Sequence, residues 1–367
     1  MENIKARNKV AYNQILLLMV LYRIMVGLTY MPAVNTVPAN QDVWISTLLS
    51  IGYTIIFNLP LIYLSNKFNK LNLLEFANKI MGRFIGGIIG VFYFLTFLFS
   101  STIIVSTLVE ILDASLFPAT PTWFTASIII LTCAYISSRG LRNIARLGEI
   151  IIPIVIIIIF LIVGLGYKNY NINELLPVFM DSTFGEINLG AIETSLKFYD
   201  ILILVMVTPN LENKKDLNRI FVKSIIYSIL IFILFLIPTQ LTLGIEFAKH
   251  VNFPFLTFTR ILQIGEIQGF DLLYITSWIM GNTLKIAGYF YFTTVALGEL
   301  INRKNQIFII PISIIIFISV IFIKDRRSIL AVPNPFNTIF SIVSIIASIV
   351  IPLIMLIVYF FRRKRLK

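Results

Sequence analysis

The chain has 367 residues, of which 58% are hydrophobic and only 13% are charged, and its formal net charge is +12. Soluble domains carry about 25% charged residues, so this composition excludes a water-soluble globular protein and predicts a membrane protein. Cys133 is the only cysteine and His250 the only histidine. One residue of each type is too few for a zinc site and leaves little basis for Ser-His-Asp or Cys-His catalysis. We therefore expect no enzyme, no metal and no cofactor.

Uncharged apolar stretches recur along the chain, and several reach the about 20 residues that cross the hydrocarbon core as a helix. We therefore expect an all-α membrane protein with about ten transmembrane helices in a single polytopic membrane domain, residues 1–367. The expected spans are 13–33, 43–64, 84–112, 121–138, 147–167, 189–210, 221–243, 271–300, 306–323 and 338–361.

Lysines and arginines gather in alternate connections between these spans, and the chain closes with Arg362-Arg363-Lys364-Arg365. Cytoplasmic connections of membrane proteins carry an excess of these residues, so we expect the N-terminus and the C-terminus in the cytoplasm. In a membrane protein, the net positive charge indicates orientation and contact with lipid headgroups, not nucleic acid.

Two expected spans, the first and the sixth, contain residues that interrupt a helix. In the first, Arg23 is followed by Val26-Gly27-Leu28-Thr29 and Pro32, and in the sixth a polar run extends from Glu193 to Asp200. Transporters built from two inverted five-helix repeats place discontinuous helices first in each half. This pattern predicts repeats at about 13–167 and 189–361, with helices 1 and 6 discontinuous. Alternatively, glycine and proline are ordinary residues of a membrane helix and Arg23 extends to the interface.

Short motifs occur in order along nearly the whole chain. They are Gln14-Ile15, Gly27 with Pro32, Gln41-Asp42-Val43-Trp44, Met81-Gly82-Arg83 with Gly86, Asn173-Glu174-Leu175-Leu176-Pro177-Val178, Phe253-Pro254, and Phe270-Asp271 leading to Trp278. In this order they resemble the spore germination permeases, the B-subunits of germinant receptors in the amino acid/polyamine/organocation transporter superfamily. The chain departs from the family at Arg23, where a small or polar residue is usual, and before Asp271, where Gln268-Gly269-Phe270 replaces an acidic-basic pair.

The resemblance implies a LeuT-like fold, the spore inner membrane, and a complex with a larger A-subunit and a lipoprotein C-subunit. It also implies a function: the chain binds a small nutrient, an amino acid, in a transporter-like pocket and signals germination through its partners. Two alternatives use the same cavity. One is an amino-acid symporter, and the other is an ion or water channel element lined by polar residues such as Ser100, Ser101 and Thr102.

The candidate ligand site lies between the two interrupted helices. The N-terminal end of a half-helix offers unpaired N–H groups to a ligand carboxylate, so we expect a carboxylate cradle at Gly27, Leu28 and Thr29. The opposing wall is expected at Ser195, Leu196 and Phe198, and Tyr93 and Phe97 are further candidates to line the cavity. Helix packing is the alternative role, because small residues are favoured where membrane helices touch.

Four charged residues in the expected spans are candidates for ion pairing or coupling: Arg23, Lys197, Asp200 and Lys285. Lys197 and Asp200 are three residues apart and could meet on one helix face. Lys285 has no carboxylate at helical spacing, so its partner is expected on another helix or in water. A basic group can replace a coupling sodium ion in relatives of this fold, and Lys285 resembles that arrangement by its charge.

Overall fold

The structure is a computed structural model that describes residues 9–30, 38–248, 250–251, 253–263, 269–324 and 335–366. Pro32, part of the expected interruption of the first span, lies outside the described residues.

Every expected span contains helix in its described part. The helices are α2 (Tyr12–Tyr30), α3 (Val43–Lys67), α5 (Arg83–Ser115), α6 (Thr122–Ser138), α7 (Leu141–Leu165), the pair α8 (Phe184–Leu196) and α9 (Ile201–Val207), α10 (Leu217–Leu243), α13 (Asp271–Ile301), α14 (Ile309–Lys324), and α15 (Pro335–Ile345), which continues through π-helical Ile346–Val350 into α16 (Ile351–Leu366). Eight of the described helical segments are long and apolar enough to cross a membrane. The chain is a multi-pass integral membrane protein.

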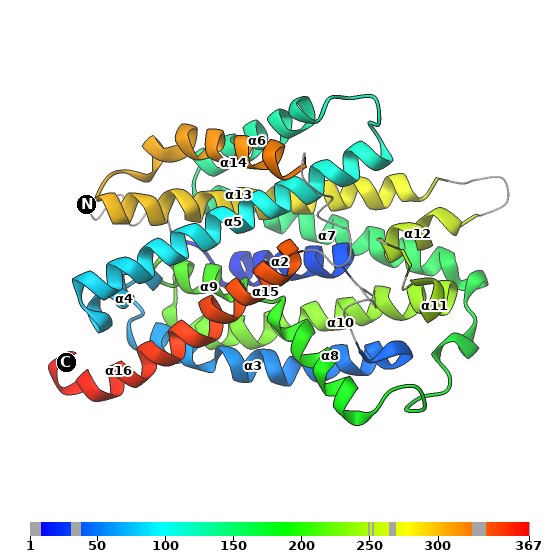
Figure 1. The fold of residues 1–367 in the computed structure, drawn as a ribbon, viewed down its shortest axis with the longest axis horizontal. Coiled ribbons are helices and arrows are strands. Elements are labelled where there is room, and N and C mark those ends of the chain that lie inside the picture. Colours follow the sequence, from blue (N-terminus) through cyan, green and yellow to red (C-terminus); the bar gives the residue numbers. More distant parts are fainter. Residues whose placement is uncertain are drawn as a thin grey trace.

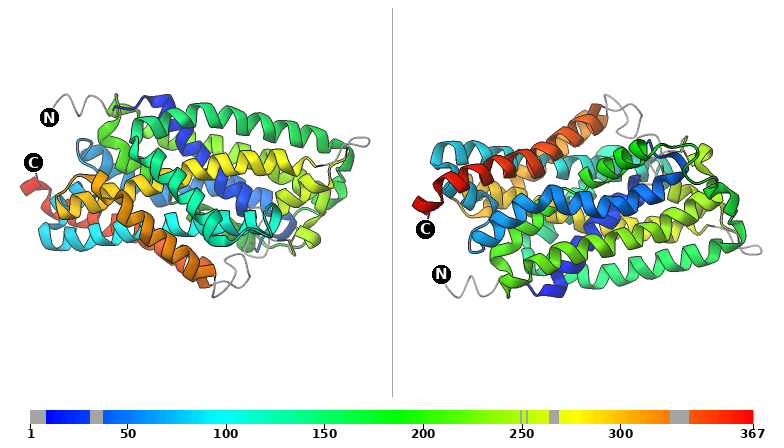
Figure 2. Two further views of the ribbon diagram at one scale, coloured as in Figure 1. Left: turned by 90° about the horizontal axis from the view of Figure 1, so that it is seen from above. Right: turned by 90° about the horizontal axis from the view of Figure 1, so that it is seen from below.

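Short helices cover the two ends of the bundle. At one end α4 (Leu73–Met81) begins with a capping box, in which Asn72 and Glu75 each accept a hydrogen bond from the other's backbone N–H. The Nη1 atom of Arg362 in α16 donates to the Ile80 carbonyl at 3.2 Å, so α16 ends beside α4. At the opposite end lie α11 (Ile245–Ala248) and α12 (Pro254–Ile261) (Figure 2).

The centre of the bundle is formed by α2 and α13. In their most apolar stretches 72% and 67% of the residues are buried, against 22% in α14, which lies at the periphery. α2 packs against α7, α10 and α13, and α13 also packs against α5, α6 and α7. Figure 1 shows α2 in the middle, with α5 and α13 on one side and α3 and α10 on the other. Residues that α2 carries at mid-length are therefore far from lipid.

The sixth span is interrupted, as the sequence predicts. α8 begins at a capping box formed by Thr183 and Glu186, and it ends at Leu196. The backbone then makes tight turns, with Phe198 N–H donating to the Ser195 carbonyl at 3.1 Å, before α9 starts at Ile201. The residues from 197 to 200 thus lie between two half-helices in the interior of the bundle.

The interruption expected in the first span at Gly27 is not found, because α2 remains helical from Tyr12 to Tyr30. Gly27 serves close packing instead: a Cβ atom added there would lie 2.5 Å from Phe232 Cε1 and 2.8 Å from Phe235 Cζ, both in α10. Small residues commonly allow such close helix approach in membranes. The glycine therefore marks a contact between α2 and α10, not a break in the described helix.

The connection after the fifth span is fastened to the start of α3. Gln41 Nε2 donates to the Pro177 carbonyl at 2.9 Å. The Oδ2 atom of Asp42 accepts from the Phe179 N–H at 3.0 Å and from the Ser182 hydroxyl. These bonds give the Gln41-Asp42 motif a structural role, since they join the end of the first half of the chain to its second helix.

Candidate functional site

A buried charged centre lies where the interrupted sixth span meets α2 and α13. Asp200, which precedes α9, is 0% exposed, as is Arg23 in α2, and Lys285 in α13 is 2% exposed. Lys285 Nζ lies 3.3 Å from Asp200 Oδ1 and donates to the Tyr22 carbonyl at 2.7 Å. Arg23 is close enough to interact electrostatically with both Asp200 and Lys285. One lysine thus connects helix one, the break in helix six and helix eight.

Hydrogen bonding at this centre is incomplete among the described residues. Arg23 Nη1 donates to Ser224 Oγ of α10 at 2.6 Å, which fixes the orientation of the guanidinium group. The Nε and Nη2 atoms of Arg23 have no partner, and neither does Asp200 Oδ2. Buried polar atoms are normally hydrogen-bonded, so each of these atoms is available to a group that the chain does not supply.

Aromatic side chains enclose the charges. The Tyr289 hydroxyl donates to Asp200 Oδ1, and the Tyr289 ring lies 6.2 Å from that of Tyr22 and 5.8 Å from that of Tyr199. Phe97 is part of this group, with its ring 6.3 Å from that of Tyr289. Charges in such surroundings interact more strongly than in water, because the local dielectric constant is low.

The pairing of the charged residues confirms one prediction and corrects another. Lys285 finds its carboxylate on another element, as expected from the absence of one at helical spacing. The expected pair between Lys197 and Asp200 is wrong, because α8 ends at Leu196 and the two residues do not share a helix face. Asp200 pairs with Lys285 instead, while Lys197 interacts with Glu193, four residues before it.

The expected carboxylate cradle lies inside a regular helix. The Leu28 carbonyl accepts from the Tyr274 hydroxyl at 2.9 Å, and Thr29 Oγ1 accepts from Trp278 Nε1 at 2.9 Å. Gly27 is buried against α10. In this conformation the three residues bind α2 to its neighbours, and contact between them and a ligand stays a prediction.

The other predicted site residues separate into two groups. At the break, Ser195 Oγ donates to the Ile192 carbonyl at 2.7 Å, Leu196 is half-buried, and the Phe198 ring lies 5.5 Å from that of Phe232. The Tyr93 hydroxyl donates to the Ala347 carbonyl at 3.0 Å, in the π-helical segment between α15 and α16. The hydroxyls proposed for a channel donate within their own helix; they belong to Ser100, Ser101 and Thr102.

Sequence reasoning missed Tyr22, Tyr289 and Ser224. Tyr289 follows Lys285 by four residues, a spacing that places both on one helix face, and this signal could have identified it. Tyr22 precedes Arg23 directly. Ser224 has no such signal, because its link to Arg23 depends on how α10 packs against α2.

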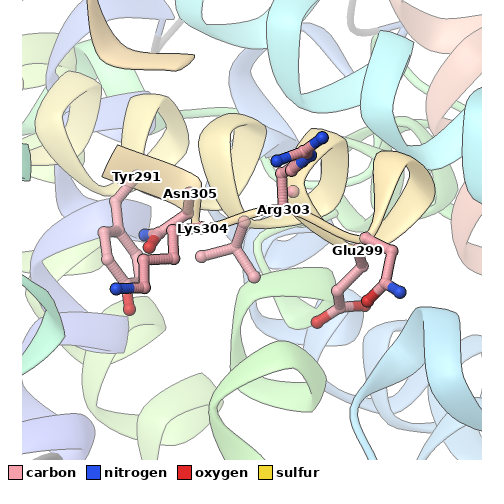
Figure 3. Close-up of a pocket in the computed structure, with 8 residues that line it drawn as sticks. Tyr291, Glu299, Arg303, Lys304 and Asn305 are labelled. Carbon is pink, nitrogen blue, oxygen red and sulfur yellow. The ribbon is translucent and has the colours of Figure 1, made fainter. Parts of the chain in front are cut away.

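A separate pocket of 470 Å³ lies at the α4 end of the bundle, where α13 ends (Figure 3). Its lining includes Tyr291, Glu299, Arg303, Lys304 and Asn305, and Glu299 also accepts a hydrogen bond from Asn72. None of the residues that line this pocket belongs to the charged centre.

The model of a family described as spore germination protein matches residues 9–331. Spore germination protein YndE of Bacillus subtilis (strain 168) is 24% identical over 304 residues, covering 81% of this chain and 82% of the relative. Spore germination protein GerQB of Bacillus cereus is 21% identical over 332 residues, covering 90% of this chain and 91% of the relative.

Solved structures of transporters share the fold. Mhp1, a nucleobase-cation-symport-1 family transporter in a closed conformation with bromovinylhydantoin bound, superposes with a TM-score of 0.65 at 12% identity and covers 97% of this chain and 79% of its own. A Na+-coupled sialic acid symporter in a substrate-bound outward-open state gives a TM-score of 0.61 at 12% identity, with 94% and 89% covered. The LeuT-like fold predicted from the sequence is confirmed.

Proposed function

Because the chain belongs to the spore germination protein family, we propose that it is the membrane subunit of a spore nutrient germinant receptor. It binds a small nutrient, an amino acid, and passes the signal to an A-subunit and a lipoprotein C-subunit in the spore inner membrane. Its N-terminus and C-terminus lie in the cytoplasm. It is not an enzyme.

The observation that carries this proposal is the charged centre at the break in helix six. Ionisable residues inside a membrane protein are costly to bury and therefore mark functional sites. Transporters of this architecture bind their substrates near the midplane, where discontinuous helices meet. Asp200 lies at such a break and pairs with Lys285 across the bundle. A nutrient that enters there would meet the half-helix ends at Ser195 and Phe198.

Nutrient binding can be converted into a signal by the same contacts. Lys285 joins the Tyr22 carbonyl of α2 to Asp200 at the break. A ligand that competes for any of these atoms changes how α2, α9 and α13 are held together. Leu28 and Thr29 also belong to α2, and their hydrogen bonds to Tyr274 and Trp278 of α13 would change if α2 moved.

The proposal is tested in spores of the source bacterium. An in-frame deletion is complemented with the wild-type chain or with Asp200→Asn, and dipicolinic acid release is measured against a panel of single nutrients. We expect the deletion to abolish the response to one nutrient set and Asp200→Asn to weaken it at matched protein level. Asp271→Asn, at an exposed ion pair with Arg260, is the control. Deletion spores that respond normally to every nutrient would overturn the proposal.

Uptake measurements separate the receptor from a symporter. Vegetative cells that express the chain are supplied with labelled amino acids, and initial uptake rates are compared with those of the deletion strain. The receptor predicts equal rates and a germination defect. A defect limited to uptake, with normal germination, would assign the charged centre to transport.

A further inference from the structure

We infer that the free edge of the Arg23 guanidinium, formed by Nε and Nη2, binds the carboxylate of the ligand. The inference rests on the proposed function, since it identifies the ligand group recognised at the same centre.

The charged centre carries more positive than negative charge. Arg23 and Lys285 contribute two positive charges, whereas Asp200, which pairs with Lys285 and interacts electrostatically with Arg23, contributes one negative charge. On the other side of the break, Glu193 and Lys197 interact with each other and contribute no net charge. One buried positive charge is thus left over among the described residues. An uncompensated buried charge is costly, so an anionic ligand group would be favoured there.

The free edge of the Arg23 guanidinium has the shape that a carboxylate requires. Nη1 of Arg23 is held by Ser224 at 2.6 Å, while Nε and Nη2, which lie side by side along one edge, have no partner. Two parallel N–H groups of a guanidinium match the two oxygens of a carboxylate. Ser224 also donates to the Phe221 carbonyl at 3.0 Å, so the anchor of the guanidinium is itself fixed.

The backbone of α2 offers a ligand no free N–H groups at residues 27–29. N–H groups inside an α-helix are bonded to carbonyls four residues earlier, and α2 is helical through residues 27–29. The Thr29 hydroxyl donates to the Met25 carbonyl at 2.6 Å and accepts from Trp278. Arg23, one turn earlier in α2, supplies N–H donors in place of these backbone groups.

Binding to the purified full-length chain in nanodiscs tests this inference directly. The probes are the common L-amino acids, each as the free acid and as its C-terminal amide, and the readout is the ligand-dependent shift in Tm. We expect at least one free acid to raise Tm and its amide to have no effect. Arg23→Gln should weaken binding of that acid about 100-fold, since two charge-assisted hydrogen bonds are lost. Arg23→Lys, which keeps the charge but not the planar edge, should weaken it about tenfold.

Arg219→Gln is the matched control, because it removes an exposed arginine from α10 and should leave binding unchanged. Equal binding of acid and amide, unchanged binding by Arg23→Gln, or no response to any free acid would each overturn the inference. Germination assays distinguish the two proposals. If deletion spores lose a nutrient response but Arg23→Gln spores keep its dose dependence, the carboxylate site is refuted and the receptor stands. If deletion has no effect while Arg23-dependent binding persists, the receptor is refuted and the site stands.

Discussion

Asp200→Asn and Lys285→Met remove opposite partners of one buried ion pair, and the charge count at the centre predicts unequal effects. Asp200 Oδ1 and Lys285 Nζ are 3.3 Å apart, with side chains 0% and 3% exposed. Coulomb's law with an effective dielectric constant of about 20 gives an attraction of about 5 kcal/mol at this distance. Asp200→Asn leaves two cations without a carboxylate, and removing one partner of a buried pair typically costs about 3–5 kcal/mol.

Lys285→Met should cost less, about 2 kcal/mol, because Asp200 keeps Arg23 as a counter-charge and the Tyr289 hydroxyl as a donor. The free energy of unfolding is measured by denaturant titration of the full-length chain in mixed micelles, followed by tryptophan fluorescence, since Trp278 is buried beside α2. Asp271→Asn makes the same chemical change at the exposed Arg260 pair and should cost no more than about 1 kcal/mol. A larger cost for Lys285→Met than for Asp200→Asn would refute the surplus of positive charge.

Two further predictions concern packing and orientation. Gly27→Val should lower the free energy of unfolding by about 1–3 kcal/mol in the same titration, because its side chain would overlap with Phe232 and Phe235. Gly52→Val is the control and should cost less than about 1 kcal/mol, because an added Cβ atom there meets no other atom within 4 Å. Equal costs for the two variants would contradict the packing of Gly27 against α10. In a chain whose Cys133 is replaced, a cysteine at Asn171 should react with an impermeant thiol reagent outside the cell and one at Lys215 should not, and the reverse pattern would contradict the orientation.

The arrangement of spans could be predicted from the sequence because hydrophobic length is a local property. Each apolar stretch has to cross the same bilayer thickness, so the boundaries follow from charges and turns at its ends. The break in helix six could also be predicted, because the polar side chains from Glu193 to Asp200 would need hydrogen-bond or ion-pair partners inside the membrane. α8 and α9 end and begin within that run.

The continuity of α2 could not be predicted from the sequence. Glycine both permits unwinding and permits close helix contact, and only the facing side chains decide between these roles. The facing residues are Phe232 and Phe235, about two hundred positions away in sequence. The partner of Lys285 was constrained to another element, but its identity as Asp200 required the fold, as did the link between Arg23 and Ser224.

Continuity of α2 changes where ligand recognition can reside. A discontinuous helix presents its own N–H groups to a ligand, whereas a continuous one uses them internally and must recognise the ligand through side chains. In this chain Arg23 lies one turn before residues 27–29 in α2, where it is buried and held by Ser224, and its Nε and Nη2 atoms have no partner among the described residues. In the proposed site, Arg23 supplies the N–H donors that the backbone of residues 27–29 uses within the helix.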